Sequence, residues 1–144
     1  MAESSSATTK ASRGVGWVAL VLATSAVAGS LWLSMGMSLK ACPLCLYQRS
    51  FVMCALAVLV VGVLLGAAES ALACVLALPA AVAGTVVAAF HVYLEWIGKL
   101  ECPAGLFAMG TAPKQSLAVL VLLSGLLLFG SSTRKTPVAT LGRA

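Results

Sequence analysis

Four long stretches without a charged side chain constrain the fold of this 144-residue chain more than any other feature. An α-helix rises about 1.5 Å per residue, so roughly 20 apolar residues cross a hydrocarbon core of about 30 Å. Backbone groups in lipid must be satisfied within the segment, and a continuous helix does this. The sequence therefore predicts an all-α membrane protein, a bundle of four transmembrane helices. The expected helices cover residues 14–39, 45–67, 70–94 and 115–132.

The composition agrees with a chain whose main solvent is lipid. Hydrophobic residues make up 61% of the chain and charged residues only 9%, whereas about a quarter of the residues in soluble domains are charged. The formal net charge is +5, but the basic residues are scattered or terminal and form no basic aromatic face. We therefore expect the lipid bilayer as a partner and no nucleic acid.

The first apolar stretch also has a feature of a secretory signal peptide. Ala26-Val27-Ala28 resembles a small-residue cleavage site. The apolar run continues well past Ala28, however, and so exceeds the usual core of about 7–15 residues. We interpret this stretch as a retained membrane span.

The positions of the basic side chains predict the orientation of the bundle. Five of the nine Lys and Arg residues lie in the two tails, namely Lys10, Arg13, Arg134, Lys135 and Arg143. An even number of spans puts both tails on one side, and the positive-inside rule places that side in the cytoplasm. We expect a multi-pass protein of the bacterial plasma (inner) membrane, with both termini cytoplasmic and two loops on the periplasmic face.

The tails and the spans define the domain organisation. Residues 1–13 and 133–144 are polar and have little to bury, so we expect two disordered cytoplasmic tails. Residues 14–132 form the four-helix membrane domain. The short linkers between its spans favour an up-down-up-down arrangement.

Two of the five cysteines lie within apolar spans. Cys54 follows Cys45 by nine residues, which is half a turn around a helix and about 13.5 Å deeper. Cys74 lies in the third span. A cysteine in an apolar helix behaves as a small hydrophobic residue, and we interpret Cys54 and Cys74 in that way.

The motif Cys42-Pro43-Leu44-Cys45 stands where the first outer loop enters the second span. Two cysteines with this spacing at a helix start can close a disulfide. The exposed N–H groups there favour a thiolate, which makes the pair redox-active. Pro43 suits the first helical turn, where its missing N–H costs nothing. The outer side of a bacterial plasma membrane is also a compartment in which disulfides persist.

Other interpretations of this motif stay open. A zinc site needs four ligands, and the chain offers only Cys102 and His91 besides, with His91 expected inside a helix. We therefore expect no metal site. A static structural disulfide is a second alternative. A third is a soft-metal membrane transporter that uses a cysteine relay, although the spans have no charged residue in their deep interior. A non-enzymatic scaffold is the weakest alternative.

Arg49 follows Cys45 by four positions, so it lies about 40° away on the same helix face and one turn deeper. A charged residue near a membrane span suggests a functional site, although an arginine at the interface can also serve as an anchor. Below a reactive cysteine pair it can stabilise a thiolate or the oxygen of a reduced quinone, because its guanidinium offers fixed donors and keeps its proton.

The run CPLCLYQR at residues 42–49 resembles the signature of the disulfide-bond-formation protein B (DsbB) family. Residues 90–94, FHVYL, resemble the His-and-aromatic segment of that family at the outer end of the third span. The stretch 102–117 is similar to the family segment that leads from the last loop cysteine into the fourth span. The resemblance covers residues 14–133, and the combination of CxxCxYxR with four spans and this second loop is specific.

The resemblance implies a thiol:quinone oxidoreductase that generates disulfides. Such a protein oxidises a periplasmic thioredoxin-like dithiol oxidase (DsbA-like) and passes two electrons to a membrane quinone, ubiquinone or menaquinone. Cys45 would be the quinone-facing thiolate and Cys42 its exchange partner. Arg49 would contact the quinone head, with Gln48 and His91 near it. Without this resemblance, a histidine at this position would more often be interpreted as a polar residue at a helix end.

The second outer loop departs from the family pattern. The family usually has two cysteines there, the first of which meets the partner oxidase. Here the loop from Glu95 to Lys114 contains only Cys102, whose context resembles the second. Three explanations remain: the partner reacts directly with Cys42 and Cys45, Cys102 forms the exchange bond itself, or the chain is an engineered or trapped variant.

Overall fold

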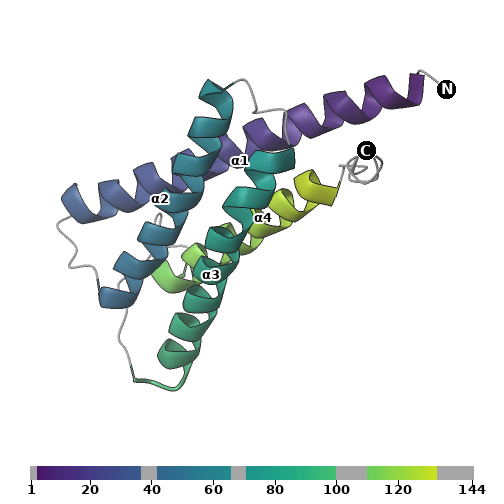
Figure 1. Ribbon diagram of the computed structural model, residues 1–144. Helices are drawn as coiled ribbons and strands as arrows, with labels where there is room; N and C mark the ends of the chain where they lie inside the picture. Colours follow the sequence, from purple (N-terminus) through teal and green to yellow (C-terminus); the bar gives the residue numbers. More distant parts are fainter. Residues whose placement is uncertain (1–2, 37–41, 66–70, 100–109, 133–144) are drawn as a thin grey trace, which may run out of the picture.

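The computed structural model describes residues 3–36, 42–65, 71–99 and 110–132. Four helices make up nearly all of this part of the chain, namely α1 (Glu3–Met35), α2 (Pro43–Leu64), α3 (Ala71–Trp96) and α4 (Ala112–Ser132). Each helix is long and apolar enough to cross a membrane. The predicted four-helix membrane fold is therefore confirmed (Figure 1).

The first helix begins earlier than the sequence predicts. Helix α1 starts at Glu3, so the segment from there to Arg13 is helical, where we expected a disordered tail. Once a helix is nucleated, each added residue gains a hydrogen bond without a further nucleation cost, and the adjoining span supplies the nucleus. In Figure 1 this end of α1 projects past the other helices. The expected tail at 133–144 lies outside the described residues.

The other helix ends differ from the predicted ones by a few residues. Helix α2 begins at Pro43, two residues early, because a proline fits the first helical turn. Helix α4 begins at Ala112, three residues early, and contains Pro113 in its first turn. Charged side chains do not stop a helix, so the end of an uncharged run is a poor guide to the end of the helix.

The four helices form a closed ring in which each packs mainly against the helices before and after it, with α4 also against α1. Figure 1 shows α2 and α3 side by side, with α1 and α4 crossing them at an angle. Small side chains let the backbones approach closely in lipid. The buried core accordingly contains many alanines together with leucines of α4, namely Ala19, Ala23, Ala55, Ala77, Ala81, Ala88, Leu120, Leu123 and Leu127.

Two glycines mark the closest approaches between helices. A Cβ atom at Gly84 would lie 3.0 Å from both Phe51 Cβ and Leu120 Cδ2, so α2, α3 and α4 meet there with no room for a larger residue. A Cβ atom at Gly130 would lie 2.9 Å from Cys74 Sγ. Cys74 therefore packs between α3 and α4, in agreement with its interpretation as a small hydrophobic residue.

Polar contacts join α3 to α4 at the end of the bundle that carries the CxxC motif. Thr111 donates a hydrogen bond to Glu95 Oε2 over 2.9 Å, and Lys114 Nζ lies 3.7 Å from Glu95 Oε1. Deeper in the bundle, the hydroxyls of Thr85 and Ser124 lie 3.0 Å apart. These contacts hold α3, and with it His91, in a set position relative to α4.

Candidate active site

Cys42 is the N-cap residue of α2. Its backbone is extended, with φ −70° and ψ 157°, and its sulfur accepts a hydrogen bond from the backbone N–H of Cys45 over 3.3 Å. Pro43 occupies the first turn, as expected. The N–H groups at a helix start have no partner within the helix and carry partial positive charge. The Cys42 sulfur therefore lies directly against the partial positive charge at the start of α2.

The two sulfurs of the CxxC motif lie next to each other. Cys42 Sγ and Cys45 Sγ are 3.1 Å apart, and both residues are partly buried. A disulfide needs an S–S distance of about 2.05 Å, so small side-chain rotations are enough to bring the sulfurs to bonding distance. The pair can therefore alternate between dithiol and disulfide without a movement of α2.

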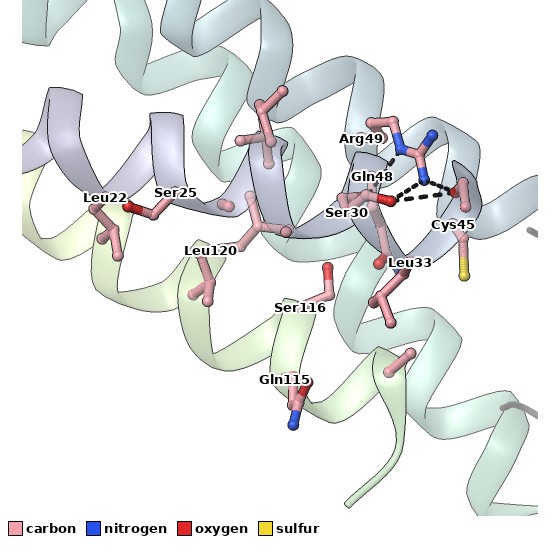
Figure 2. Close-up of a pocket in the computed structure, with 17 residues that line it drawn as sticks. Leu22, Ser25, Ser30, Leu33, Cys45, Gln48, Arg49, Gln115, Ser116 and Leu120 are labelled. Carbon is pink, nitrogen blue, oxygen red and sulfur yellow. Dashed lines mark hydrogen bonds between the residues drawn. The ribbon is translucent and has the colours of Figure 1, made fainter. Parts of the chain in front are cut away.

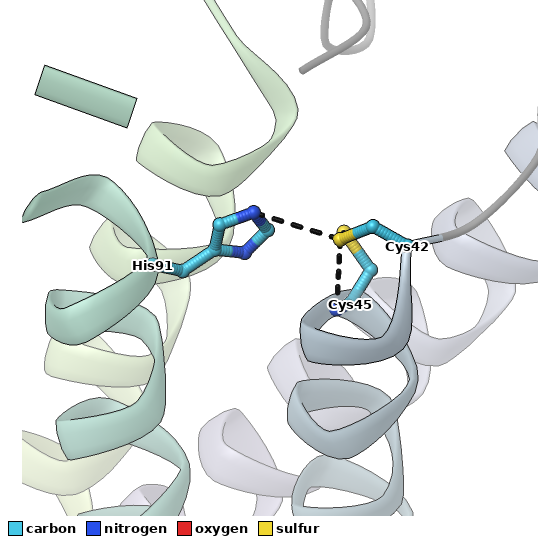
Figure 3. A group of neighbouring side chains, drawn as sticks. All are labelled: Cys42, Cys45 and His91. Carbon is cyan, nitrogen blue, oxygen red and sulfur yellow. Dashed lines mark hydrogen bonds between the residues drawn. The ribbon is translucent and has the colours of Figure 1, made fainter. Parts of the chain in front are cut away.

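His91 of α3 faces this pair from the other side of the helix interface (Figure 3). Its ring is buried, with Nε2 3.6 Å from Cys42 Sγ and Nδ1 3.0 Å from Gln48 Nε2. An amide nitrogen only donates, so with this amide orientation Nδ1 accepts and Nε2 carries the hydrogen. The hydrogen on Nε2 then points at Cys42 Sγ. Two donors, the Cys45 N–H and the His91 ring, are thus directed at the Cys42 sulfur.

A cavity of about 320 Å³ opens between α1, α2 and α4 (Figure 2). Leucine, valine and alanine side chains make up much of its wall. The polar groups that reach it come from all three helices, namely Ser25, Ser30 and Ser34 of α1, Cys45, Gln48 and Arg49 of α2, and Gln115 and Ser116 of α4. Cys45 of the CxxC motif therefore lines a mainly apolar cavity that also has hydrogen-bonding groups in its wall.

Arg49 spans the gap between α2 and α1 at the edge of this cavity (Figure 2). Its Nε donates to Ser30 Oγ over 2.8 Å and its Nη2 to the Ser30 carbonyl over 2.9 Å. Nη2 also donates to Ser34 Oγ. These bonds use three of the five N–H donors of a guanidinium. They orient the plane of the group, so its positive charge stays beside Cys45 and the cavity.

The chain matches the sequence profile of the family Disulfide bond formation protein DsbB over residues 12–126. It belongs to the DsbB family. The matched range contains the CxxC motif, Arg49, His91 and every residue that lines the cavity. The chain is therefore a multi-pass membrane protein of disulfide-bond formation, and the family assigns it oxidoreductase chemistry. No curated protein and no solved structure gave a significant match.

The structure brings three of the residues singled out from the DsbB signature onto one cavity. Cys45, Gln48 and Arg49 all line it, as their spacing along one helix face predicts. The place of His91 near a quinone head, which the resemblance implies, stays a prediction. His91 lies on α3 and contacts Cys42 and Gln48, whereas α1, α2 and α4 supply the described cavity residues. Cys102 lies outside the described residues.

The partners of Arg49 were not predicted from the sequence. Ser30 and Ser34 are four residues apart on α1, so they share one face of that helix. Two hydroxyls at this spacing in an apolar span were a usable signal for a polar partner. Gln115 and Ser116 were also not assigned to the site, because nothing local indicates which face of α4 meets α1.

Proposed function

We propose that this chain is a thiol:quinone oxidoreductase. It oxidises the dithiol of a periplasmic thioredoxin-like (DsbA-like) partner and passes two electrons through Cys42 and Cys45 to ubiquinone or menaquinone. The observation that carries this proposal is that Cys45, one half of a close sulfur pair, lines a cavity shared with Gln48 and Arg49. Membership of the DsbB family supports it.

The residues around the cavity fit a quinone head. A dry cavity of about 150 Å³ is large enough for benzene, so about 320 Å³ has room for a substituted ring. The aliphatic walls suit the ring faces. Gln48, Arg49 and Gln115 can donate hydrogen bonds to ring oxygens. A quinone bound there would supply the chemistry of a two-electron, two-proton acceptor.

Each residue at the cavity then has its own role in the reaction. Cys45 holds the reactive sulfur at the cavity. Cys42 lies next to His91. Its Sγ is 3.1 Å from Cys45 Sγ, so the two sulfurs can form and break a disulfide. Arg49 keeps positive charge beside the cavity, where it favours the thiolate of Cys45 and negative charge on a bound acceptor. Gln48 both lines the cavity and holds the His91 ring.

Thiol–disulfide exchange supplies the electrons. A thiolate of the reduced partner attacks an outward disulfide of this protein and forms a mixed disulfide, which the second partner thiol resolves. The partner leaves with its own disulfide, and Cys42 and Cys45 become the dithiol. Whether Cys102 takes part is decided by comparing Cys102→Ser with the parent in the same exchange reaction.

The proposal is tested by following quinone absorbance in detergent. Purified protein is mixed with a water-soluble quinone analogue and a reduced thioredoxin-like partner. We expect quinone loss that depends on both proteins, with one partner disulfide formed per quinone reduced. Quinone reduction at the rate of the partner alone would contradict the proposal.

The structure offers less support for a cysteine-relay metal transporter. Such a relay needs Cys54 and Cys74 to continue a path inward from the CxxC motif. Cys54 is exposed on α2, towards lipid, while Cys74 is buried against Gly130 between α3 and α4. These two sulfurs therefore lie in different surroundings and do not extend a path from Cys42 and Cys45.

The proposed chemistry requires the CxxC motif to face the periplasm and both termini to face the cytoplasm. A reporter enzyme that is active only in the periplasm is therefore expected to give no signal when fused after Ala144. The matched control is the same reporter fused after Lys99, beyond the end of α3, where a strong signal is expected. A strong signal from the C-terminal fusion would reverse the orientation and put Cys42 and Cys45 in a reducing compartment.

A further inference from the structure

We propose that Cys42, Cys45 and His91 form a Zn²⁺-binding site in the reduced protein, and that closing the Cys42–Cys45 disulfide abolishes it. Their ligand atoms, two Sγ and one ring nitrogen, all lie within 4.8 Å of one another. No metal site was predicted from the sequence, because zinc needs four ligands and the chain offers only Cys102 and a His91 inside a helix besides the motif. The packing of α3 against α2 brings the His91 ring to Cys42.

The two ligand–ligand distances that involve Cys42 lie near those of a tetrahedral centre. Zn–S bonds of about 2.3 Å and Zn–N bonds of about 2.0 Å put neighbouring sulfur and nitrogen ligands roughly 3.5 Å apart, and two sulfurs roughly 3.8 Å apart. Cys42 Sγ and His91 Nε2 are already 3.6 Å apart. The two sulfurs, at 3.1 Å, need to separate by only about 0.7 Å to match this geometry.

The ligands are held by rigid elements. Cys42 and Cys45 share the first turn of α2, and the buried His91 ring is held at Nδ1 by Gln48. A histidine that binds metal through Nε2 carries its hydrogen on Nδ1 and donates it to an outer partner. Gln48 can accept that hydrogen through Oε1 after a half-turn of its amide. The fourth position suits a water molecule, because both cysteines are partly exposed.

The oxidation state of the cysteines controls this site. Binding converts two thiols into two Zn–S bonds and releases two protons. In the disulfide form both sulfurs are bonded to each other, so His91 remains as a single weak ligand. Zn²⁺ would therefore bind only after the Cys42–Cys45 disulfide has been reduced and before the dithiol is oxidised again. If the proposed function holds, bound Zn²⁺ keeps the dithiol from being reoxidised and inhibits turnover reversibly.

Cobalt titration of the full-length protein in detergent tests the site directly. The protein is reduced with a phosphine under anaerobic conditions, and Co²⁺ is added as the spectroscopic probe. We expect thiolate-to-cobalt charge-transfer bands in the near ultraviolet and tetrahedral bands in the visible range. These bands should saturate at one Co²⁺ per chain, disappear on addition of Zn²⁺, and be absent from the oxidised protein.

Variants identify the ligands. Cys42→Ser and Cys45→Ser should each remove the charge-transfer bands, and His91→Asn should weaken Co²⁺ binding by at least about tenfold. Cys54→Ser and Cys74→Ser are matched controls that should bind like the parent. Cys102→Ser should also retain the bands.

Three outcomes would overturn the proposal: no bands in the reduced parent protein, equal bands in its oxidised form, or loss of the bands in Cys102→Ser with His91→Asn unaffected. The parent measurements do not depend on whether any variant folds. The titration contains no quinone and no partner protein. Failure of metal binding and failure of the proposed oxidoreductase function are therefore separate results.

Discussion

Replacing Cys45 with serine is expected to abolish quinone reduction, with a loss of about a thousandfold or more in turnover. A serine hydroxyl cannot form a disulfide and is not ionised near neutral pH, so it can neither receive electrons from exchange nor pass them on. Cys42→Ser should cause a similar loss, because the same disulfide cannot close. The measurement is the initial rate of quinone absorbance loss with a reduced thioredoxin-like partner.

The controls for this prediction come from the cysteines inside the spans. Cys54→Ala and Cys74→Ala should keep activity within a few-fold of the parent. Cys54 is exposed on α2, and Cys74 packs against Gly130 away from the cavity. If either proved essential while Cys45 did not, a cysteine relay for metal ions would become the better account of this chain.

Arg49 is the residue with the second-largest expected effect. Arg49→Ala should raise the quinone concentration needed for half-maximal rate by about tenfold to a hundredfold and slow reduction, since a charge-assisted hydrogen bond contributes about 1.5–3 kcal/mol. Arg49→Lys should give a smaller increase. A lysine keeps the charge, but its single ammonium cannot reproduce the planar set of donors that contacts both Ser30 and Ser34.

The hydrogen bonds to α1 require a control of their own, because Arg49 also joins α2 to α1. Ser34→Ala removes one of these bonds and leaves the guanidinium in place, so its effect should be smaller than that of Arg49→Lys. Exchange of Cys42 and Cys45 with a small dithiol should persist in every one of these variants, because that step does not use the cavity. If Arg49→Lys and the parent gave the same curve of rate against quinone concentration, Arg49 would be a membrane anchor and not a contact of the quinone.

The positions of Cys45 and Arg49 illustrate what local spacing can predict. Both side chains line the same cavity, because four residues along a helix return to nearly the same face. The N-cap position of Cys42 was predictable for a similar reason, since Pro43 marks the first turn. Each of these features depends on one segment of the chain.

His91 and Ser30 illustrate what spacing cannot predict. His91 lies against Cys42, 49 residues away in the chain, and Ser30 holds Arg49 from another helix. Such contacts depend on how far each helix is rotated about its own axis. That rotation is set by packing, for instance by the close approach of α2, α3 and α4 at Gly84. Hydrophobicity is nearly uniform around these helices, so it carries little information about the rotation.

The sequence alone therefore determined the four spans and the residues that share the reactive face of α2. Both follow from the length of apolar runs and from the geometry of a single helix. The cavity between α1, α2 and α4 and the cluster of Cys42, Cys45 and His91 arise only when the helices pack. In lipid, small differences in side-chain size and a few polar contacts select that packing, and no single segment contains them all.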